Sequence, residues 1–144
     1  MINPVTEPHF FPKKVIDNEK GNILHALRRD DLEFSSFGEA YLSKLNRNSI
    51  KGWKKHLSAT LNLFVANGAV RFVALSESKS GEVNKCFEMT LHEDNHGLLL
   101  VPPGVWLAFG SQKSKSASIV NISSETHDPL ESINVDFQTY AHFW

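Results

Sequence analysis

Short apolar segments separated by turn residues are the feature that most constrains how this chain of 144 residues folds. The segments are rich in β-branched and aromatic residues and partly alternate apolar with polar positions, which is typical of strands. The predicted strands are residues 22–27, 37–44, 50–55, 61–66, 69–75, 84–91, 97–101, 105–109 and 117–122. Many short strands with turns at this spacing predict a sandwich or barrel.

One turn signal is especially strong. Asn67-Gly68 lies between two apolar segments, and this dipeptide accepts the positive φ angles of a type I′ turn, so we expect a β-hairpin there. No repeat or long linker divides the chain, and we expect a single all-β jelly-roll domain over residues 1–144.

Charge and cysteine content exclude several classes of protein. A formal net charge of −1 gives no reason to expect nucleic acid or a membrane surface as a partner. The single cysteine, Cys86, allows neither an intramolecular disulfide nor a multi-cysteine metal site. The chain starts with neither a basic stretch nor an apolar run, so we expect a cytoplasmic protein.

Seven segments of the chain, taken in order, resemble one known family. Lys51-Gly52-Trp53-Lys54-Lys55-His56 is similar to an Arg-Gly-Leu-His-x-Gln signature, and residues 101–109 are similar to Ile-Pro-x-Gly-Phe-x-His-Gly-Phe. The other similar segments are residues 17–21, 37–43, 61–70, 126–131 and 133–136. The set resembles the dTDP-4-dehydrorhamnose 3,5-epimerases, which are RmlC-like cupins with a jelly-roll β-sandwich fold.

The resemblance implies an epimerase that removes a proton beside a ketone, but the residues known for this step are replaced. The signature places the family's basic histidine on Lys54 and its glutamine on His56. The later histidine falls on Leu107, and the acidic tyrosine falls on Thr126 or His127. The recognised base and the recognised acid are therefore both missing.

Two replacements can still carry the chemistry. Lys54 and His56 alternate on one predicted strand, so both side chains point to the same face, opposite Trp53 and Lys55. A lysine whose pKa is lowered by burial can act as a base, and histidine transfers protons near neutral pH. His25 is a third candidate because it alternates with apolar neighbours. The alternatives are that Lys54 holds a phosphate and that both histidines are structural.

The resemblance also implies residues that bind substrate. Lys51 and Lys20 stand where the family has arginines that contact the nucleotide or the sugar. Lysine keeps the charge but lacks the bidentate geometry of arginine. Further candidates are Glu39, Tyr41, Asn62, Trp106 and His127. Core packing for Trp106 and a simple turn at His127 remain open alternatives.

No metal or other cofactor is expected. The ligand positions of metal-binding cupins hold Lys54, His56, Leu61 and Leu107, and one histidine cannot hold a divalent ion. His92 and His96 are four residues apart, but their segment is short and ends in glycine, which favours a solvated turn.

The sequence leaves three functions open. The first is an epimerase or isomerase acting on a dTDP-4-keto-6-deoxy sugar in surface-polysaccharide biosynthesis. The second is a jelly roll that binds a nucleotide sugar or glycan without chemistry, and the third is an interaction protein with an inert cavity. The resemblance further implies a homodimer that exchanges N-terminal strands.

Overall fold

The computed structural model describes residues 5–113 and 115–144, and most of its regular structure is β-strand. The strands and 3₁₀ helices are β1 (His9–Pro12), β2 (Val15–Ile16), β3 (Ile23–Leu24), β4 (Glu39–Leu45), β5 (Ile50–His56), β6 (Leu61–Asn67), β7 (Val70–Glu77), β8 (Val83–Leu91), η1 (Glu93–Asn95), β9 (Gly97–Val101), β10 (Trp106–Ser111), β11 (Ala117–Ser123), η2 (Pro129–Glu131), β12 (Ser132–Asn134) and η3 (Phe137–Phe143).

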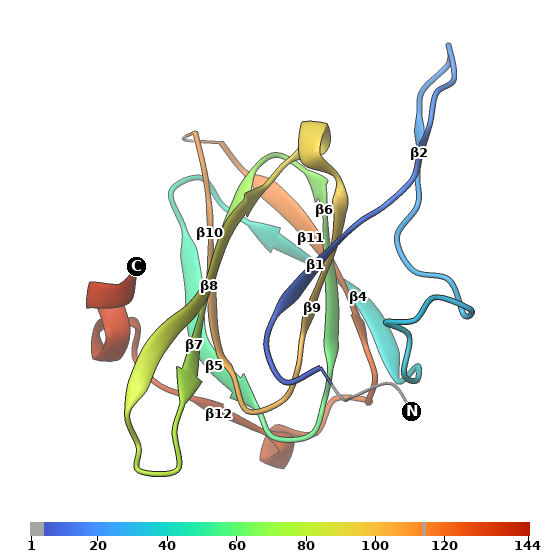
Figure 1. Cartoon of the computed structure of the whole chain (residues 1–144). Coiled ribbons are helices and arrows are strands. Elements are labelled where there is room, and N and C mark those ends of the chain that lie inside the picture. The colour runs from blue at the N-terminus through green and yellow to red at the C-terminus, as the bar shows by residue number, and fades with distance from the viewer. Residues whose placement is uncertain (1–4, 114) are drawn as a thin grey trace.

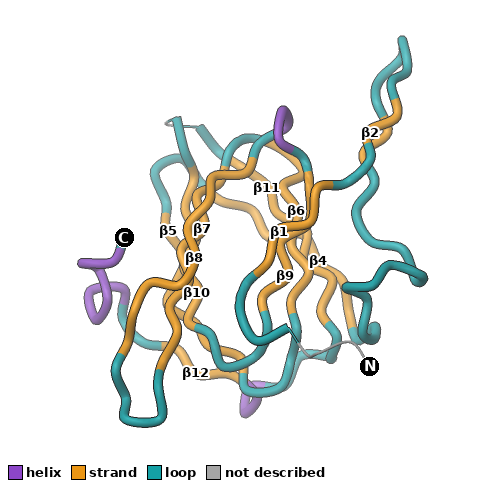
Figure 2. The backbone as a smooth tube through the Cα atoms, viewed as in Figure 1, coloured by secondary structure: helices purple, strands orange, loops and turns teal. Residues whose placement is uncertain are grey.

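Two five-stranded antiparallel sheets face each other as a sandwich (Figure 1). The first sheet has the order β1-β9-β6-β11-β4, and the second has the order β12-β5-β10-β7-β8. Apart from β7 and β8, which form a hairpin, neighbours in each sheet are not consecutive in sequence, as expected for a jelly roll. Figure 2 shows that the helical turns lie outside this framework of strands. The predicted jelly-roll sandwich is therefore confirmed.

Apolar side chains fill one half of the space between the sheets. Phe72 and Val70 of β7 have no exposed surface, and they lie in one cluster with Leu99 and Val101 of β9 and Leu91 of β8. Strand residues alternate between faces, so every second residue of these strands reaches this core. These side chains close one half of the sandwich. That half lies between β6 and β9 of the first sheet and β7 and β8 of the second.

The predicted hairpin at Asn67-Gly68 is wrong in one respect. The turn exists, and Gly68 has a φ of +80°, but β6 pairs with β9 and β11, whereas β7 pairs with β8 and β10. The turn therefore connects the two sheets. A Cβ on Gly68 would lie 2.7 Å from the carbonyl oxygen of Ser116, so the β10–β11 loop crowds this crossing.

Segments at both ends of the chain cover the outer faces, and sequence patterns did not predict the strands β1, β2 and β12. Near the N-terminus, the Lys13 ammonium pairs with Glu33 and lies 2.8 Å from Asp31. At the C-terminus, the aromatic residues of η3 pack on Trp53 of β5, whose indole N–H donates to the carbonyl of Phe137 at 3.1 Å. The first contact joins the segment after β1 to the β3–β4 connection, and the second anchors the C-terminal segment to β5.

The β2–β3 hairpin projects from the sandwich (Figure 1). Its two strands pair only with each other, through Val15 with Leu24 and Ile16 with Ile23. Ile23 is 54% exposed. Among the described residues, no helix is long and apolar enough to cross a membrane.

Candidate functional site

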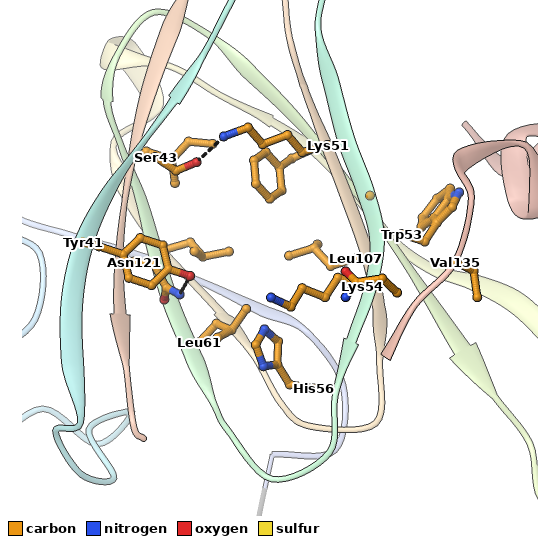
Figure 3. A pocket seen from close by; sticks show the side chains of 15 residues that line it. Tyr41, Ser43, Lys51, Trp53, Lys54, His56, Leu61, Leu107, Asn121 and Val135 are labelled. Carbon is orange, nitrogen blue, oxygen red and sulfur yellow. Dashed lines mark hydrogen bonds between the residues drawn. The ribbon is translucent and has the colours of Figure 1, made fainter. Parts of the chain in front are cut away.

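The half of the sandwich beside β4 and β5 holds a cavity of about 320 Å³. Its walls come from the inner faces of β4, β5, β6, β10 and β11, and β12 contributes at its edge. Figure 3 shows Lys51, Lys54 and His56 reaching from β5 toward Ser43, Tyr41 and Asn121 on the opposite sheet. The cavity wall is largely apolar, but unlike the core beside it the wall also carries polar and charged side chains.

A bulge at Gly52 decides which β5 side chains enter the cavity. Regular alternation would send Lys51 to the opposite face from Lys54. Instead Lys54 pairs with Leu107 and Lys51 pairs with Phe109, so the register shifts between them and both lysines line the cavity. Gly52 has a φ of +144°, and a Cβ there would lie 2.5 Å from the Cβ of Ala108. Glycine is required at this bulge.

His56 is paired with a carboxylate. Its Nδ1 lies 2.7 Å from Oε2 of Glu131, and both side chains are at least four-fifths buried. The backbone amides of Leu57, Ser58 and Ala59 donate to the other oxygen, Oε1, at 2.8–3.0 Å. β12 follows Glu131 directly and pairs with β5, with Ser132 opposite His56, which fixes both partners.

These contacts keep Glu131 ionised. Burial alone would raise the pKa of its carboxyl group, but the amides of Ala59 and Ser58 and the ring of His56 outweigh burial and lower the pKa to about 2. A carboxylate accepts hydrogen bonds and donates none, so Nδ1 of His56 carries the proton that faces Glu131. In the neutral ring the lone pair then lies on Nε2, which makes Nε2 a base.

The two cavity lysines have different surroundings. The Lys51 ammonium donates to Oγ of Ser43 on β4 at 2.8 Å and is exposed. Lys54 is half-buried, and no side-chain hydrogen bond or ion pair reaches it from the rest of the described chain. In Figure 3, Lys54 lies next to His56 and points across the cavity. A bound ligand can therefore use the charge of Lys54 without displacing a protein partner.

Tyr41 and Asn121 form a pair on the opposite wall. The two residues are directly opposed in the register of β4 and β11, and the Asn121 amide donates to the Tyr41 hydroxyl at 2.9 Å. Asn121 is 2% exposed, so its position is fixed by packing. Because Tyr41 accepts this hydrogen bond, its own O–H remains available to donate to a ligand.

Two other predicted residues lie at the end of the cavity beyond His56. Glu39 of β4 is half-buried, and His127 follows β11 and is exposed. Both line a small recess that also contacts Tyr41, Lys54 and His56. The structure thus brings together Glu39, Tyr41, Lys51, Lys54, His56 and His127.

Four predicted residues lie elsewhere. Lys20 is in the turn of the β2–β3 hairpin, and the His25 carbonyl accepts a hydrogen bond from the buried His96 ring. Asn62 is fully buried on the face of β6 opposite Leu61 and Leu63, which line the cavity. Trp106 lies on the outer face of its sheet, where Lys55 sits 4.7 Å above its ring and Glu77 accepts from its indole N–H. None of the four lines the cavity.

Sequence reasoning assigned no role to Glu131 or Asn121. The segment 126–131 contained the only available signal for Glu131, namely its resemblance to a motif that ends in glutamate. Asn121 had no such signal. Among the described residues, no group of three or more His, Cys, Asp or Glu side chains could hold a metal ion.

The fold can be compared with solved structures. The chain superimposes on a dTDP sugar isomerase from Desulfovibrio desulfuricans G20 with a TM-score of 0.85 and 30% identity, over 97% of this chain and 90% of that one. The chain belongs to the dTDP-sugar isomerase family. This places it among the RmlC-like cupins, in agreement with the resemblance of its motifs.

Solved structures of lower sequence identity share the fold. A dTDP-4-dehydrorhamnose 3,5-epimerase from Sulfolobus tokodaii gives a TM-score of 0.77 at 18% identity, covering 94% of this chain and 81% of that one. A sugar 3,4-ketoisomerase from Thermoanaerobacterium thermosaccharolyticum, solved with TDP, gives 0.71 at 16% identity over 96% of both chains. No protein-family model matches the sequence, and a search of curated proteins finds no match.

Proposed function

We propose that this member of the dTDP-sugar isomerase family moves a proton at a carbon beside the ketone of a dTDP-4-keto-6-deoxy sugar. The observation that carries the proposal is the hydrogen bond between Nδ1 of His56 and the ionised Glu131, which leaves Nε2 as a base in the cavity. Its structural neighbours include a dTDP-4-dehydrorhamnose 3,5-epimerase and a sugar 3,4-ketoisomerase in complex with TDP, which supports a substrate of this class.

The cavity supplies a second and a third group for this reaction. His56 takes the proton from carbon, and the electron pair moves onto the ketone oxygen to give an enolate. The Lys54 ammonium, which has no protein partner among the described residues, stabilises the negative oxygen. Tyr41 returns a proton to carbon from the opposite wall and recovers its own from solvent, while His56 releases its proton.

The nucleotide part of the substrate fits the other end of the cavity. Lys51 carries the positive charge at that end, and the hydroxyl of Ser43 lies beside it. A diphosphate is attracted to such a site, although lysine cannot grip it bidentately as arginine does. This arrangement directs the sugar toward Lys54 and His56.

A second candidate function is binding of a nucleotide sugar without chemistry. Leu107 favours it, because it puts an apolar side chain in the cavity wall where the motif of the epimerases has a histidine. The two functions differ in one observable, the exchange of a carbon-bound proton with solvent.

The proposal extends to assembly and location. Two copies joined through one face of the β2–β3 hairpin would cover its exposed Ile16 and Ile23, which pair across the two strands, and would bring Lys20 toward a neighbouring copy. We expect a cytoplasmic homodimer that serves surface-polysaccharide biosynthesis. Sedimentation of the wild type as a dimer and of Ile23→Lys as a monomer would support this assembly, and a monomeric wild type would contradict it.

The test of the reaction is incubation with dTDP-4-keto-6-deoxyglucose in deuterated water, followed by proton NMR. Loss of the C3 or C5 proton signal supports the enzyme. Saturation transfer to the ligand without any loss of signal supports the binding module. If the experiment shows no proton exchange and no saturation transfer, both functions are rejected for this sugar.

A further inference from the structure

The cavity continues past His56 into a small acidic recess lined by Glu39, Glu125, His127 and Asp128. The recess shares Tyr41, Lys54 and His56 with the main cavity, so a ligand that reaches the base also borders the recess. Its volume is about 20 Å³, which holds one group about the size of a water molecule. The shape therefore limits what a substrate can place there.

The carboxylates of the recess are not equally available to a ligand. Glu125 accepts from the Ser58 hydroxyl at 2.8 Å, and Asp128 accepts from the Leu130 amide at the start of η2. Glu131 is occupied by His56 and by backbone amides. Glu39 is half-buried, and no hydrogen bond or ion pair from the described residues reaches its carboxylate. Glu125 and Asp128 each have one oxygen engaged, whereas neither oxygen of Glu39 has a partner among the described residues, so Glu39 is the acceptor most available to a ligand.

The sign of charge changes along the cavity. Lys51 lies at one end, Lys54 and His56 lie in the middle, and the acidic recess lies beyond them. On β4 the inward-facing residues lie in the same order: Ser43 beside Lys51, then Tyr41, then Glu39 in the recess. A nucleotide sugar bound with its diphosphate at Lys51 thus presents the far side of its sugar ring to Glu39.

On the basis of the proposed function, we infer that the acidic recess binds one small hydrogen-bond-donating substituent of the sugar, a hydroxyl or an ammonium group. Glu39 is the specificity-determining acceptor. A carboxylate would meet the charge of Glu39 at close range, with like-charge repulsion in a partly desolvated site. An acetamido group exceeds the size of the recess.

The test uses four methyl glucosides: the neutral glucoside, its 4-amino-4-deoxy analogue, the 4-acetamido analogue and the glucuronide. Binding is followed through the His56 ring signals in NMR titrations. The amino compound is expected to bind about tenfold more tightly than the neutral one, because its hydrogen bond to Glu39 is charge-assisted. The glucuronide and the acetamido compound are expected to bind more weakly than the neutral glucoside.

These probes carry no nucleotide, so their order of affinity is independent of dTDP binding, which is measured separately by calorimetry. Absence of dTDP binding alone would count against the proposed function and not against the recess. Equal affinity for the amino compound and the glucuronide, or no shift of His56 with the amino compound, would overturn the inference.

A pair of variants tests whether Glu39 causes the preference for the amino compound. Glu39→Gln should remove the preference for the amino compound and leave dTDP affinity unchanged. Glu19→Gln, an equivalent change in the exposed β2–β3 turn, should keep the preference. If Glu39→Gln retains the full preference, Glu39 is not the acceptor.

Discussion

The two halves of the sandwich differ in what occupies the space between their sheets. In the closed half, fully buried side chains such as Phe72, Val70 and Leu99 meet across the gap. In the open half, β4 and β12 are edge strands, and the side chains between the sheets include Lys54, His56 and Tyr41. One architecture thus uses apolar packing for stability in one half and leaves polar groups accessible in the other.

This comparison predicts that the same Phe→Ala substitution lowers the free energy of unfolding by different amounts in the two halves. Phe72 and Phe109 are in contact, with ring centroids 5.8 Å apart, but Phe72 is fully buried while Phe109 borders the cavity. Phe72→Ala should lower the free energy of unfolding by about 3–5 kcal/mol. Phe109→Ala should cost roughly half as much, because its site is already next to open space. Urea denaturation measures both, and equal losses would show that the halves do not differ in packing.

The largest effect on rate is expected at His56. His56→Asn keeps an N–H donor for Glu131 but removes the base. We expect kcat to fall by about a thousandfold, within the range for loss of a general base, while thermal stability changes little. His142→Asn, on the exposed C-terminal turn η3, is the matched control. A variant at His56 with normal turnover would exclude His56 as the base.

In the open half, the ionised carboxylate of Glu131 should contribute to the folding stability of the protein. Its folded pKa of about 2 lies below the ordinary value of 4.5, so its stabilising contribution is present above about pH 4.5 and is lost as the pH falls toward 2. The shift corresponds to about 3 kcal/mol. Glu131→Gln should be less stable than the wild type at pH 7, and the difference should shrink between pH 4.5 and pH 2. A difference that is constant with pH would contradict the ionised state.

Lys54 should affect catalysis more than folding. Lys54→Met removes the charge beside His56, and we expect a loss of about 10²-fold in kcat with little change in stability. Lys55→Met is the matched control on the same strand, because Lys55 points outward to Glu77 and Trp106. Equal effects of the two variants on kcat would remove Lys54 from the reaction.

The smallest predicted effect concerns the nucleotide end of the cavity. Lys51 is exposed and bonded to Ser43, so its interaction with a diphosphate is partly screened by solvent. Lys51→Ala should weaken dTDP binding by about tenfold or less, with a smaller loss at high salt. Calorimetry at two ionic strengths checks this, and an unchanged affinity would place the diphosphate elsewhere.

The sequence was sufficient for the fold and for part of the site. Strand periodicity predicted most strands, and alternation on β5 predicted that Lys54 and His56 share a face opposite Trp53 and Lys55. Periodicity failed where the backbone departs from regular alternation. The bulge at Gly52 brings Lys51 to the same face as Lys54, and the turn at Gly68 joins two sheets instead of forming a hairpin.

The pairing of His56 with Glu131 could not be predicted from local sequence patterns. The two residues are 75 positions apart and meet only because β12 pairs with β5. The same holds for Asn121, whose partner Tyr41 is 80 positions away. Such contacts depend on the order of strands in the sheets, which no short motif encodes.

The most direct test of His56 as the base is the protonation state of its ring. Long-range ¹H–¹⁵N NMR of the free protein at pH 8 distinguishes a protonated Nδ1 from a protonated Nε2. The contact with ionised Glu131 predicts that Nδ1 carries the proton and that Nε2 is bare. Glu131→Gln should abolish this preference. A proton on Nε2 in the wild type would leave the cavity without the base on which the proposed reaction depends.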